Sequence, residues 1–285
     1  MILAGITVFN PDAEVLKRNI QAILPQVDRL ICVDNGGDNR QRIREEMENL
    51  FPSVEWVGDG QNRGVAEALN QMFCYAKEHT MEWVLTLDQD SVCPPNMIEE
   101  YKKYMDVKDL GSLCPVICDR HYENREDVQD DCTQMDKCIT SASLTSVKVW
   151  EAVGGFLGDL FIDFVDHDFS AKLIKQKLQI IRVNSVLLEH EIGNGKTVSF
   201  FGKKITVLNH GPMRKYYMVR NWIYYIKEHG KVINVPMEWL KLFFLFVKTA
   251  IYEENKLQKL RAMCQGLRDA RSFCNKIRVK GMSEI

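Results

Sequence analysis

The sequence lacks several features that often reveal a function. Its 285 residues contain no CxxC pair, no GxGxxG dinucleotide motif and no GxxxxGK[ST] phosphate loop. A formal net charge of -2 and a pI near 6.3 leave no excess of positive charge for broad attraction to nucleic acid. We therefore expect no nucleic acid partner, and neither glycine motif is there to hold a dinucleotide or a triphosphate.

The cysteines do not suggest a disulfide framework. There are nine of them, an odd number, scattered along the chain, which is typical of reduced thiols in a cytosolic protein. One group contains a histidine as well, but its irregular spacing favours isolated thiols over a zinc site. This group is Cys114, Cys118, His121, Cys132 and Cys138. We expect a cytoplasmic protein without a structural zinc ion.

Long apolar runs are also missing. The N-terminus, MILAGITVFNP, lacks the basic start of a secretory signal. The apolar segment from Trp239 to Tyr252 is interrupted by Lys241 and Lys248 and is shorter than the roughly 20 residues that span a bilayer. The hydrophobic fraction of 46% is nevertheless ample for a core, so we expect a folded protein without a membrane span.

What the first half does contain is a regular alternation of two patterns. Short apolar runs ended by Asn, Asp or Gly read as strands: ILAGITVF, RLICVDNG, VEWVGDG and WVLTL. The segments between them carry apolar residues at helical spacing, as in NPDAEVLKRNIQAIL. Strands that alternate with helices predict an α/β fold with a mostly parallel central sheet.

Polar residues follow the predicted strands at the points where ligands bind in parallel sheets. In such sheets the loops beyond the carboxyl ends converge, and helix N-termini there offer free N–H groups. The residues concerned are Asn10, Asp34, Asn62, Asp88 and Asp90. Turn formation is the alternative for each of them, because Asn, Asp and Gly are the residues that tight turns use.

The stretch LDQD ends the fourth strand with Asp88 and Asp90. Residues two apart in an extended chain point the same way, so we expect both carboxylates to project together while Gln89 faces away. Paired carboxylates repel each other unless a cation intervenes, and Mg²⁺ or Mn²⁺ commonly binds through one or two carboxylates plus substrate phosphates. The alternative is a turn in which Asp90 caps a helix beginning near Pro94.

Several segments, in this order, resemble the family 2 glycosyltransferases, which are inverting enzymes with the α/β fold called GT-A. They span most of the chain and look most like the bacterial rhamnosyltransferase branch. The segments are ITVFNP, VDNG, NRGVAEALN, LDQD, SASLTSVKVWEAVGGF, LFIDFVDHDFSAKL, LEHEIG and HGPMRKYYMVRNWIYY. The resemblance implies transfer of a sugar from a nucleotide-sugar donor, with Mn²⁺ or Mg²⁺, to a saccharide or lipid-linked acceptor of bacterial surface polysaccharide.

The resemblance also assigns roles to single residues. Asp88 lies by the ribose or the metal, Asp90 binds the metal, and His190 completes the metal site, although a lone histidine is more often structural. The residues that contact the nucleotide are Thr7, Phe9, Asn10, Asp34, Asn62 and Gly64. Among possible donors, the rhamnosyltransferase branch favours dTDP-rhamnose, with UDP-sugars as the alternative.

The second half supplies the expected catalytic base. Alignment by its neighbours makes Asp166 the general base, but Val165 replaces the usual first acid of the family pair. Asp163 and Asp168 therefore remain alternatives, and so does a helix start enriched in Asp without a catalytic role.

A later segment, HGPMRKYYMVRN, carries further candidates. Arg214, Tyr217 and Asn221 fall on one helix face, where they are able to meet a diphosphate or an acceptor together. For Arg220 a solvent-exposed basic face is the main alternative.

Two domains are expected. Residues 1–220 form the GT-A domain, with a nucleotide-binding half at 1–110 and an acceptor half at 111–220, and residues 221–285 form a helical extension. Aromatic residues and lysines in WLKLFFLFVK suit either a helix on a membrane surface or a subunit interface in a homo-oligomer.

Two other functions remain open. One is a sugar nucleotidyltransferase, but FNPDAE lacks the Gly-rich basic loop of that class. The other is a non-catalytic nucleotide- or carbohydrate-binding relative, which Val165 leaves open.

Overall fold

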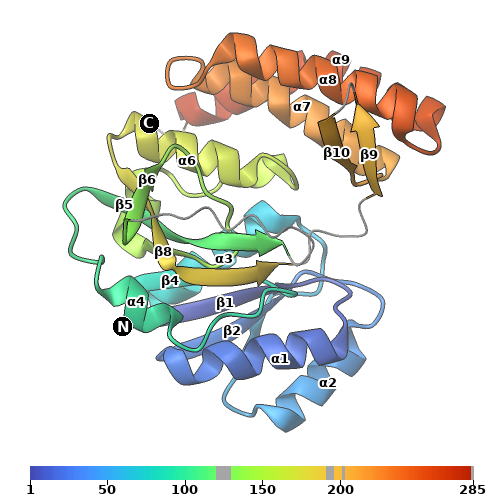
Figure 1. Cartoon of the computed structure of the whole chain (residues 1–285). Coiled ribbons are helices and arrows are strands. Elements are labelled where there is room, and N and C mark those ends of the chain that lie inside the picture. Colours follow the sequence, from blue (N-terminus) through green and yellow to red (C-terminus); the bar gives the residue numbers. More distant parts are fainter. Residues whose placement is uncertain (120–129, 191–195, 201–202, 284–285) are drawn as a thin grey trace. The chain divides into compact units, whose positions relative to one another are not determined.

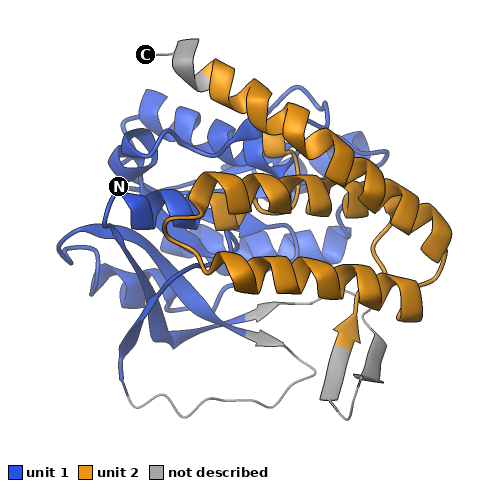
Figure 2. Cartoon of the chain, turned by 90° about the horizontal axis from the view of Figure 1, so that it is seen from above, with its two compact units in different colours: residues 1–158, 169–191 blue, residues 159–168, 192–285 orange. Residues whose placement is uncertain are grey.

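The structure is a computed structural model that describes residues 1–119, 130–190, 196–200 and 203–283, and it separates into two compact units (Figure 2). The first unit comprises Met1–Gly158 and Phe169–Glu191. The second comprises Asp159–Asp168 and Ile192–Ile285. The domain boundary predicted at residue 220 falls inside a helix of the second unit, α7 (Pro212–His229).

The first unit is built on an eight-stranded sheet. In spatial order its strands are β3 (Glu55–Val57), β2 (Arg29–Asp34), β1 (Ile2–Val8), β4 (Trp83–Asp88), β7 (Ser143–Ser146), β5 (Leu110–Asp119), β8 (Gln179–His190) and β6 (Cys132–Met135). The pairs among β3, β2, β1 and β4 are all parallel, as is β5 with β8, whereas β7 and β6 pair antiparallel with their neighbours. The predicted α/β fold with a mostly parallel sheet is confirmed.

The helices of the first half lie where the apolar periodicity predicts them. Helix α1 (Ala13–Ile23) is capped by Asp12, whose carboxylate accepts from the N–H of Val15 at 3.0 Å. Its buried residues Leu16, Ile20 and Ile23 recur at helical spacing. The other helices of the first half are η1 (Leu24–Gln26), α2 (Arg40–Leu50), α3 (Val65–Glu78) and α4 (Met97–Lys102). Three further helices follow later in the chain: α5 (Val147–Ala152), η2 (Gly158–Leu160) and α6 (Val165–Lys175).

Strand β1 is buried on both faces because helices cover each of them. Ile2, Ala4, Ile6 and Val8 join the core that also contains the apolar faces of α1 and α2, which lie together along the sheet (Figure 1). On the other face a Cβ at Gly5 would come within 2.5 Å of the Met72 sulfur of α3. Glycine at position 5 therefore lets α3 pack directly on the strand.

The second unit is mainly helical. Its long helices are α7, α8 (Val235–Tyr252) and α9 (Lys256–Ser283), and it also contains a hairpin of β9 (Lys196–Phe200) and β10 (Lys203–Val207). Val219, Leu242, Leu245 and Met263 form its core. The predicted helical C-terminal region is confirmed. Within the described part of the chain, no helix is both long enough and apolar enough to cross a membrane.

A buried ion cluster ties the three helices together. The ammonium groups of Lys215 on α7 and Lys259 on α9 both contact the carboxylate of Glu253, and all three side chains are at most 3% exposed. Thr249 of α8 also accepts from the Lys215 ammonium, at 3.1 Å. Burial lowers the pKa of Lys215, and the bond to Glu253 opposes that effect. Because buried charges are stable only when paired, the cluster fixes how these helices meet.

Candidate active site

The carboxyl ends of β2, β1 and β4 bring three predicted donor-site residues together. Val8 is in register with Asp34, and Thr7 is in register with Asp88, so these side chains belong to adjacent strands at one edge of the sheet. The Thr7 hydroxyl is buried and has no hydrogen-bond partner among the described residues. A buried hydroxyl without a partner is costly, so this edge offers a polar group that a bound ligand would satisfy.

Asp34 is buried and already held by its own loop. One carboxylate oxygen accepts from the N–H of Gly36 at 3.0 Å, and the other lies 3.3 Å from the Arg40 guanidinium. These contacts orient the carboxylate, and each oxygen retains further acceptor capacity for an N–H group. Arg40 was not foreseen, because nothing in the sequence pattern distinguishes it from the other arginines of its helix.

Asn10 and Phe9 follow β1, and their polar contacts shape the neighbouring loops. Asn10 has a positive φ of 47°, and its side-chain oxygen accepts from the N–H of Asp38 at 2.6 Å. The N–H of Phe9 donates to the Gln89 side chain at 2.8 Å, while the Phe9 ring is 42% exposed. The Gln89 amide therefore links the turn after β4 to the end of β1.

Asn62 and Gly64 form the turn that starts α3. The Asn62 side chain accepts from the N–H of Gly64 at 3.1 Å, and the N–H of Arg63 donates to Asn35 at 3.0 Å. Gly64 has a φ of 87°, a left-handed conformation that favours glycine. The local contacts of Asn62 are thus those of a turn. The bond from Arg63 to Asn35 fixes this loop to the end of β2.

Asp88 and Asp90 lie on either side of the turn that closes β4, and both residues are half-buried. The Asp88 carbonyl accepts from the Asn19 side chain at 2.8 Å, which anchors the turn to α1. The alternative role of Asp90 as a helix cap is wrong, because α4 begins at Met97 and its N-cap residue is Asn96. Asp88 is in register with Thr7 on the neighbouring strand, and Asp90 follows it in the turn.

A divalent cation fits this donor set only with help from the substrate. Among the residues that the structure describes, no group of three His, Cys, Asp or Glu side chains could hold a metal ion. The predicted third ligand, His190, ends β8, and its side chain lies outside the described part of the structure. Two carboxylates are enough for Mg²⁺ or Mn²⁺ when substrate phosphates and water supply the remaining oxygens.

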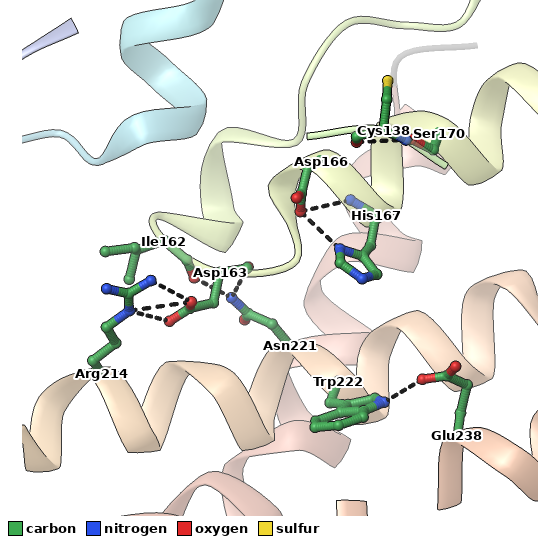
Figure 3. A network of polar contacts seen from close by, with 10 residues as sticks. All are labelled: Cys138, Ile162, Asp163, Asp166, His167, Ser170, Arg214, Asn221, Trp222 and Glu238. Atoms are coloured by element: carbon green, nitrogen blue, oxygen red, sulfur yellow. Dashed lines mark hydrogen bonds and ion pairs between the residues drawn. The ribbon is translucent and has the colours of Figure 1, made fainter. Parts of the chain in front are cut away.

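In the second unit, the segment Asp159–Asp168 carries four aspartates with different partners, and Figure 3 shows part of this network. Asp159 pairs with Lys276 at 2.6 Å and with Lys280 at 3.2 Å. Asp168 is fully buried, and one of its oxygens lies 2.8 Å from Nε2 of His229. Neither is suited to take a proton from a substrate, because Asp159 is held by two lysines and Asp168 is out of reach.

Asp166 is the most accessible of the remaining candidates. Its side chain is 22% exposed, and one oxygen accepts from both the backbone N–H and Nδ1 of His167, each at 2.8 Å (Figure 3). Burial raises the pKa of the Asp166 carboxyl, but the bonds from His167 outweigh burial and leave the pKa below its ordinary value. The carboxylate is therefore ionised at neutral pH and has a second oxygen on which to accept a proton.

Asp163 is committed to an ion pair instead. Both of its oxygens lie 3.2 Å from Nε of Arg214, and its side chain is 13% exposed (Figure 3). Burial raises the pKa of Asp163, and Arg214 counteracts only part of that effect. This pairing makes Asp163 a positioning group and leaves Asp166 as the better candidate for the base.

Helix α7 holds the aspartate segment through the face that the sequence predicts. Arg214 pairs with Asp163, and the Tyr217 ring stacks on Phe161 with centroids 5.1 Å apart. The Asn221 side chain is fully buried and donates to the carbonyls of Leu160, Ile162 and Asp163 at 2.8 to 3.0 Å. The three residues share one face as expected, but in this structure their contacts are with the chain itself.

Asn221 was predicted to help bind the donor, and its surroundings do not fit that role. Its amide nitrogen is occupied by three carbonyls and its oxygen accepts from Arg220 at 2.9 Å. Arg220 is buried as well, so a solvent-exposed basic face is wrong for this residue. Its guanidinium lies 4.0 Å from the Phe273 ring centroid and 4.7 Å from that of Tyr217, which is cation–π geometry.

Backbone strain concentrates in the same segment. Phe161, Asp163 and Phe164 have φ values of 60° to 67°, a left-handed conformation that is rare for residues other than glycine. Such conformations persist only where surrounding contacts impose them, and they cluster at functional sites. The bonds from Asn221 and Arg214 are contacts of this kind, and they hold the turn that leads into Asp166.

Comparison with known proteins identifies a family and a relative of similar length. A model of the family described as "Glycosyl transferase family 2" matches residues 4–173, which is more than half of the chain. A relative, dTDP-rhamnosyl transferase RfbF of Shigella flexneri, is 26% identical over 281 residues, which cover 91% of this chain and 92% of the relative.

Solved structures with the same fold are more distant in sequence. One is the mannosyltransferase PcManGT from Pyrobaculum calidifontis in complex with GDP-Man and Mn²⁺, at 13% identity and a TM-score of 0.59, covering 99% of this chain and 79% of that one. Another is GalNAc-T7 with UDP, GalNAc and Mn²⁺, at 9% identity and a TM-score of 0.60. It matches 80% of this chain, which spans about half of GalNAc-T7 at 47%. The predicted GT-A fold is thereby confirmed.

Proposed function

We propose that this chain, which belongs to glycosyl transferase family 2, transfers rhamnose from dTDP-rhamnose to a saccharide or lipid-linked saccharide with inversion at the anomeric carbon. The name of the Shigella flexneri relative supports this donor, because the likeness extends over nearly the whole of both chains. A lipid-linked acceptor would bring the enzyme to the cytoplasmic face of the cell membrane.

The assignment of the general base depends on the accessibility and the ion-pair partners of Asp166. Of the four aspartates in its segment, it is the one with an accessible carboxylate that neither lysine nor arginine neutralises. In the proposed step the acceptor hydroxyl gives its proton to Asp166, and the acceptor oxygen attacks the anomeric carbon. The bond from that carbon to the diphosphate oxygen breaks on the opposite side, and dTDP leaves with the electron pair.

The sheet edge of the first unit is proposed to hold the donor. Asp34, oriented by Arg40, would accept the N–H of the pyrimidine ring, and the turns at Asn10 and Asn62 would shape the nucleotide pocket. Asp88 and Asp90, completed by His190, are proposed to hold Mn²⁺ or Mg²⁺. When bound there, the cation would supply positive charge to the departing diphosphate. The Thr7 hydroxyl would then find the partner that it lacks.

A panel of nucleotide sugars tests this function directly. With Mn²⁺ present, we expect dTDP-rhamnose to raise the unfolding temperature of the full chain and to be hydrolysed slowly, and GDP-sugars to do neither. UDP-sugars would show whether the enzyme selects its donor by the pyrimidine base or by the sugar. Asp90→Ala should remove the metal-dependent part of both effects, whereas Asp106→Ala, which changes an exposed aspartate elsewhere in the first unit, should not.

Each outcome of this panel has a consequence. Protection by dTDP compounds without any turnover in the presence of acceptor would favour a non-catalytic binding protein. Formation of dTDP-rhamnose from dTTP and rhamnose 1-phosphate would favour a sugar nucleotidyltransferase. Protection by UDP compounds alone would remove rhamnose as the donor sugar.

A further inference from the structure

Helix α8 has two different faces. Leu242, Leu245 and Thr249 are buried and point into the second unit. The opposite face, called here the outer face of α8, exposes large apolar side chains of which 45% to 62% of the surface is accessible. Its residues are Met237, Trp239, Leu240, Phe243, Phe244 and Ile251.

These residues form one continuous stripe. Leu240, Phe244 and Ile251 are four and seven residues apart, which places them on one side of a helix, and Phe243 adjoins them. Single exposed apolar residues are ordinary, but a contiguous apolar stripe on a protein surface marks a surface that contacts another molecule or a membrane. The outer face of α8 is therefore a candidate docking surface.

The C-terminal part of the chain, which contains α8, carries an excess of positive charge. Residues 192–285 contain 18 Lys and Arg against six Asp and Glu, a net charge of +12, whereas residues 1–191 contain 19 against 33, a net charge of -14. Within α8 the single carboxylate, Glu238, is buried and accepts from Trp222 at 2.8 Å (Figure 3). It also accepts from Lys241 at 2.6 Å. The exposed side chains of Lys231 and Lys256 lie just before and just after the helix, and one exposed carboxylate, Glu254, also lies at its C-terminal end.

We propose that the outer face of α8 inserts into the surface of a membrane that carries anionic lipids. Aromatic and aliphatic side chains with flanking lysines are what an amphipathic helix needs in order to lie in the headgroup region. Each basic residue near an anionic membrane surface adds roughly 1 kcal/mol of attraction. A second copy of this chain is the less favourable occupant, because two such surfaces would face each other with the same positive charge.

Vesicle flotation with the full chain tests this surface without any donor or acceptor. We expect the protein to float with vesicles that contain about 30% phosphatidylglycerol, and much less with pure phosphatidylcholine. Salt at about 0.5 M should weaken the binding, because it screens the lysines. Since no sugar transfer is measured, failure of this test leaves the proposed glycosyltransferase function untouched.

Three variants locate the contact. Phe243→Ser with Phe244→Ser should reduce binding to the anionic vesicles at least about tenfold, and Lys231→Glu with Lys256→Glu should reduce it as well. Leu50→Ser removes a leucine of similar exposure, 47%, from α2 of the first unit and should bind like the unchanged protein. Circular dichroism verifies that each variant is folded, and the lysine variant keeps the test valid should the phenylalanine variant unfold.

Two results would overturn the proposal. One is unchanged vesicle binding by both α8 variants. The other is a dimer in sedimentation velocity that Phe243→Ser with Phe244→Ser converts to a monomer, with no vesicle binding by the unchanged protein; the outer face would then be an interface between two copies.

Discussion

Nδ1 of His167 lies 2.8 Å from Oδ1 of Asp166, the same oxygen that accepts the backbone N–H of His167 at 2.8 Å. An ionised carboxylate only accepts hydrogen bonds, so the ring nitrogen carries the proton. Both bonds fall on one oxygen and leave the other available to a substrate. The residue after the proposed base thus orients it and lowers its pKa.

Asp166→Asn should abolish sugar transfer while leaving donor binding intact. The amide cannot take a proton, and loss of a general base costs typically two to four orders of magnitude in kcat. Single-turnover assays measure transfer, and thermal protection by the donor measures binding. Asp168→Asn is the matched comparison, because Asp168 is a buried partner of His229. This variant should lower the free energy of unfolding rather than act directly on the transfer step. Normal transfer by Asp166→Asn would remove this residue from the role of base.

His167→Phe should move the pH dependence of transfer. The substitution keeps an aromatic ring beside Phe164 but removes the ring hydrogen bond, so burial then acts on Asp166 with less opposition and its pKa rises. Because the base must be ionised to act, the acidic limb of kcat/KM should shift to higher pH. A fall in kcat with an unmoved acidic limb would mean that His167 serves only packing.

Asn221→Leu should destabilise the second unit. The change deprives three carbonyls of their donor, those of Leu160, Ile162 and Asp163, at a cost of about 1 kcal/mol for each lost bond. We expect the free energy of unfolding to fall by about 2–4 kcal/mol in urea titrations. Asn49→Leu, at an exposed position on α2, is the control and should change little. Equal stability of both variants would contradict the described network.

His210 should make the protein less stable in mild acid. Burial, together with Arg214 and Lys215, lowers the pKa of His210 from 6.5 to about 4. Between these two values the unfolded chain binds a proton that the folded chain does not, so stability is lost as the pH falls through this window. Urea unfolding at about pH 7 and about pH 5 measures the loss, and His210→Gln should reduce it. An identical loss in the variant would place the effect elsewhere.

Much of the nucleotide-binding half could be predicted because it depends on local patterns. The apolar spacing of Leu16, Ile20 and Ile23 marks one face of a helix, and the polar residues that end adjacent parallel strands must meet at one edge of the sheet. Asp34 and Asp88 accordingly lie at that edge. The family model, which matches residues 4–173, and the solved structures support the same architecture.

The rest could not be predicted because it depends on contacts between distant segments. Asn221 and Arg220 read as solvent or ligand contacts on a helix, but the carbonyls and rings that bury them come from residues 159–163 and from Phe273. The left-handed turn at Phe161 and Asp163 contains no glycine that would announce it. The bond from the Phe9 N–H to Gln89 also joins two segments that are distant in the sequence, the end of β1 and the turn after β4.

The ion cluster of Lys215, Glu253 and Lys259 also sets a lower limit on the length of an expressible protein. A version shortened to end with α8 at Tyr252 would lack Glu253, so the buried ammonium of Lys215 would have no counterion. Shortened versions made for crystallisation should therefore extend well into α9, and a shorter fragment would be expected to aggregate on expression.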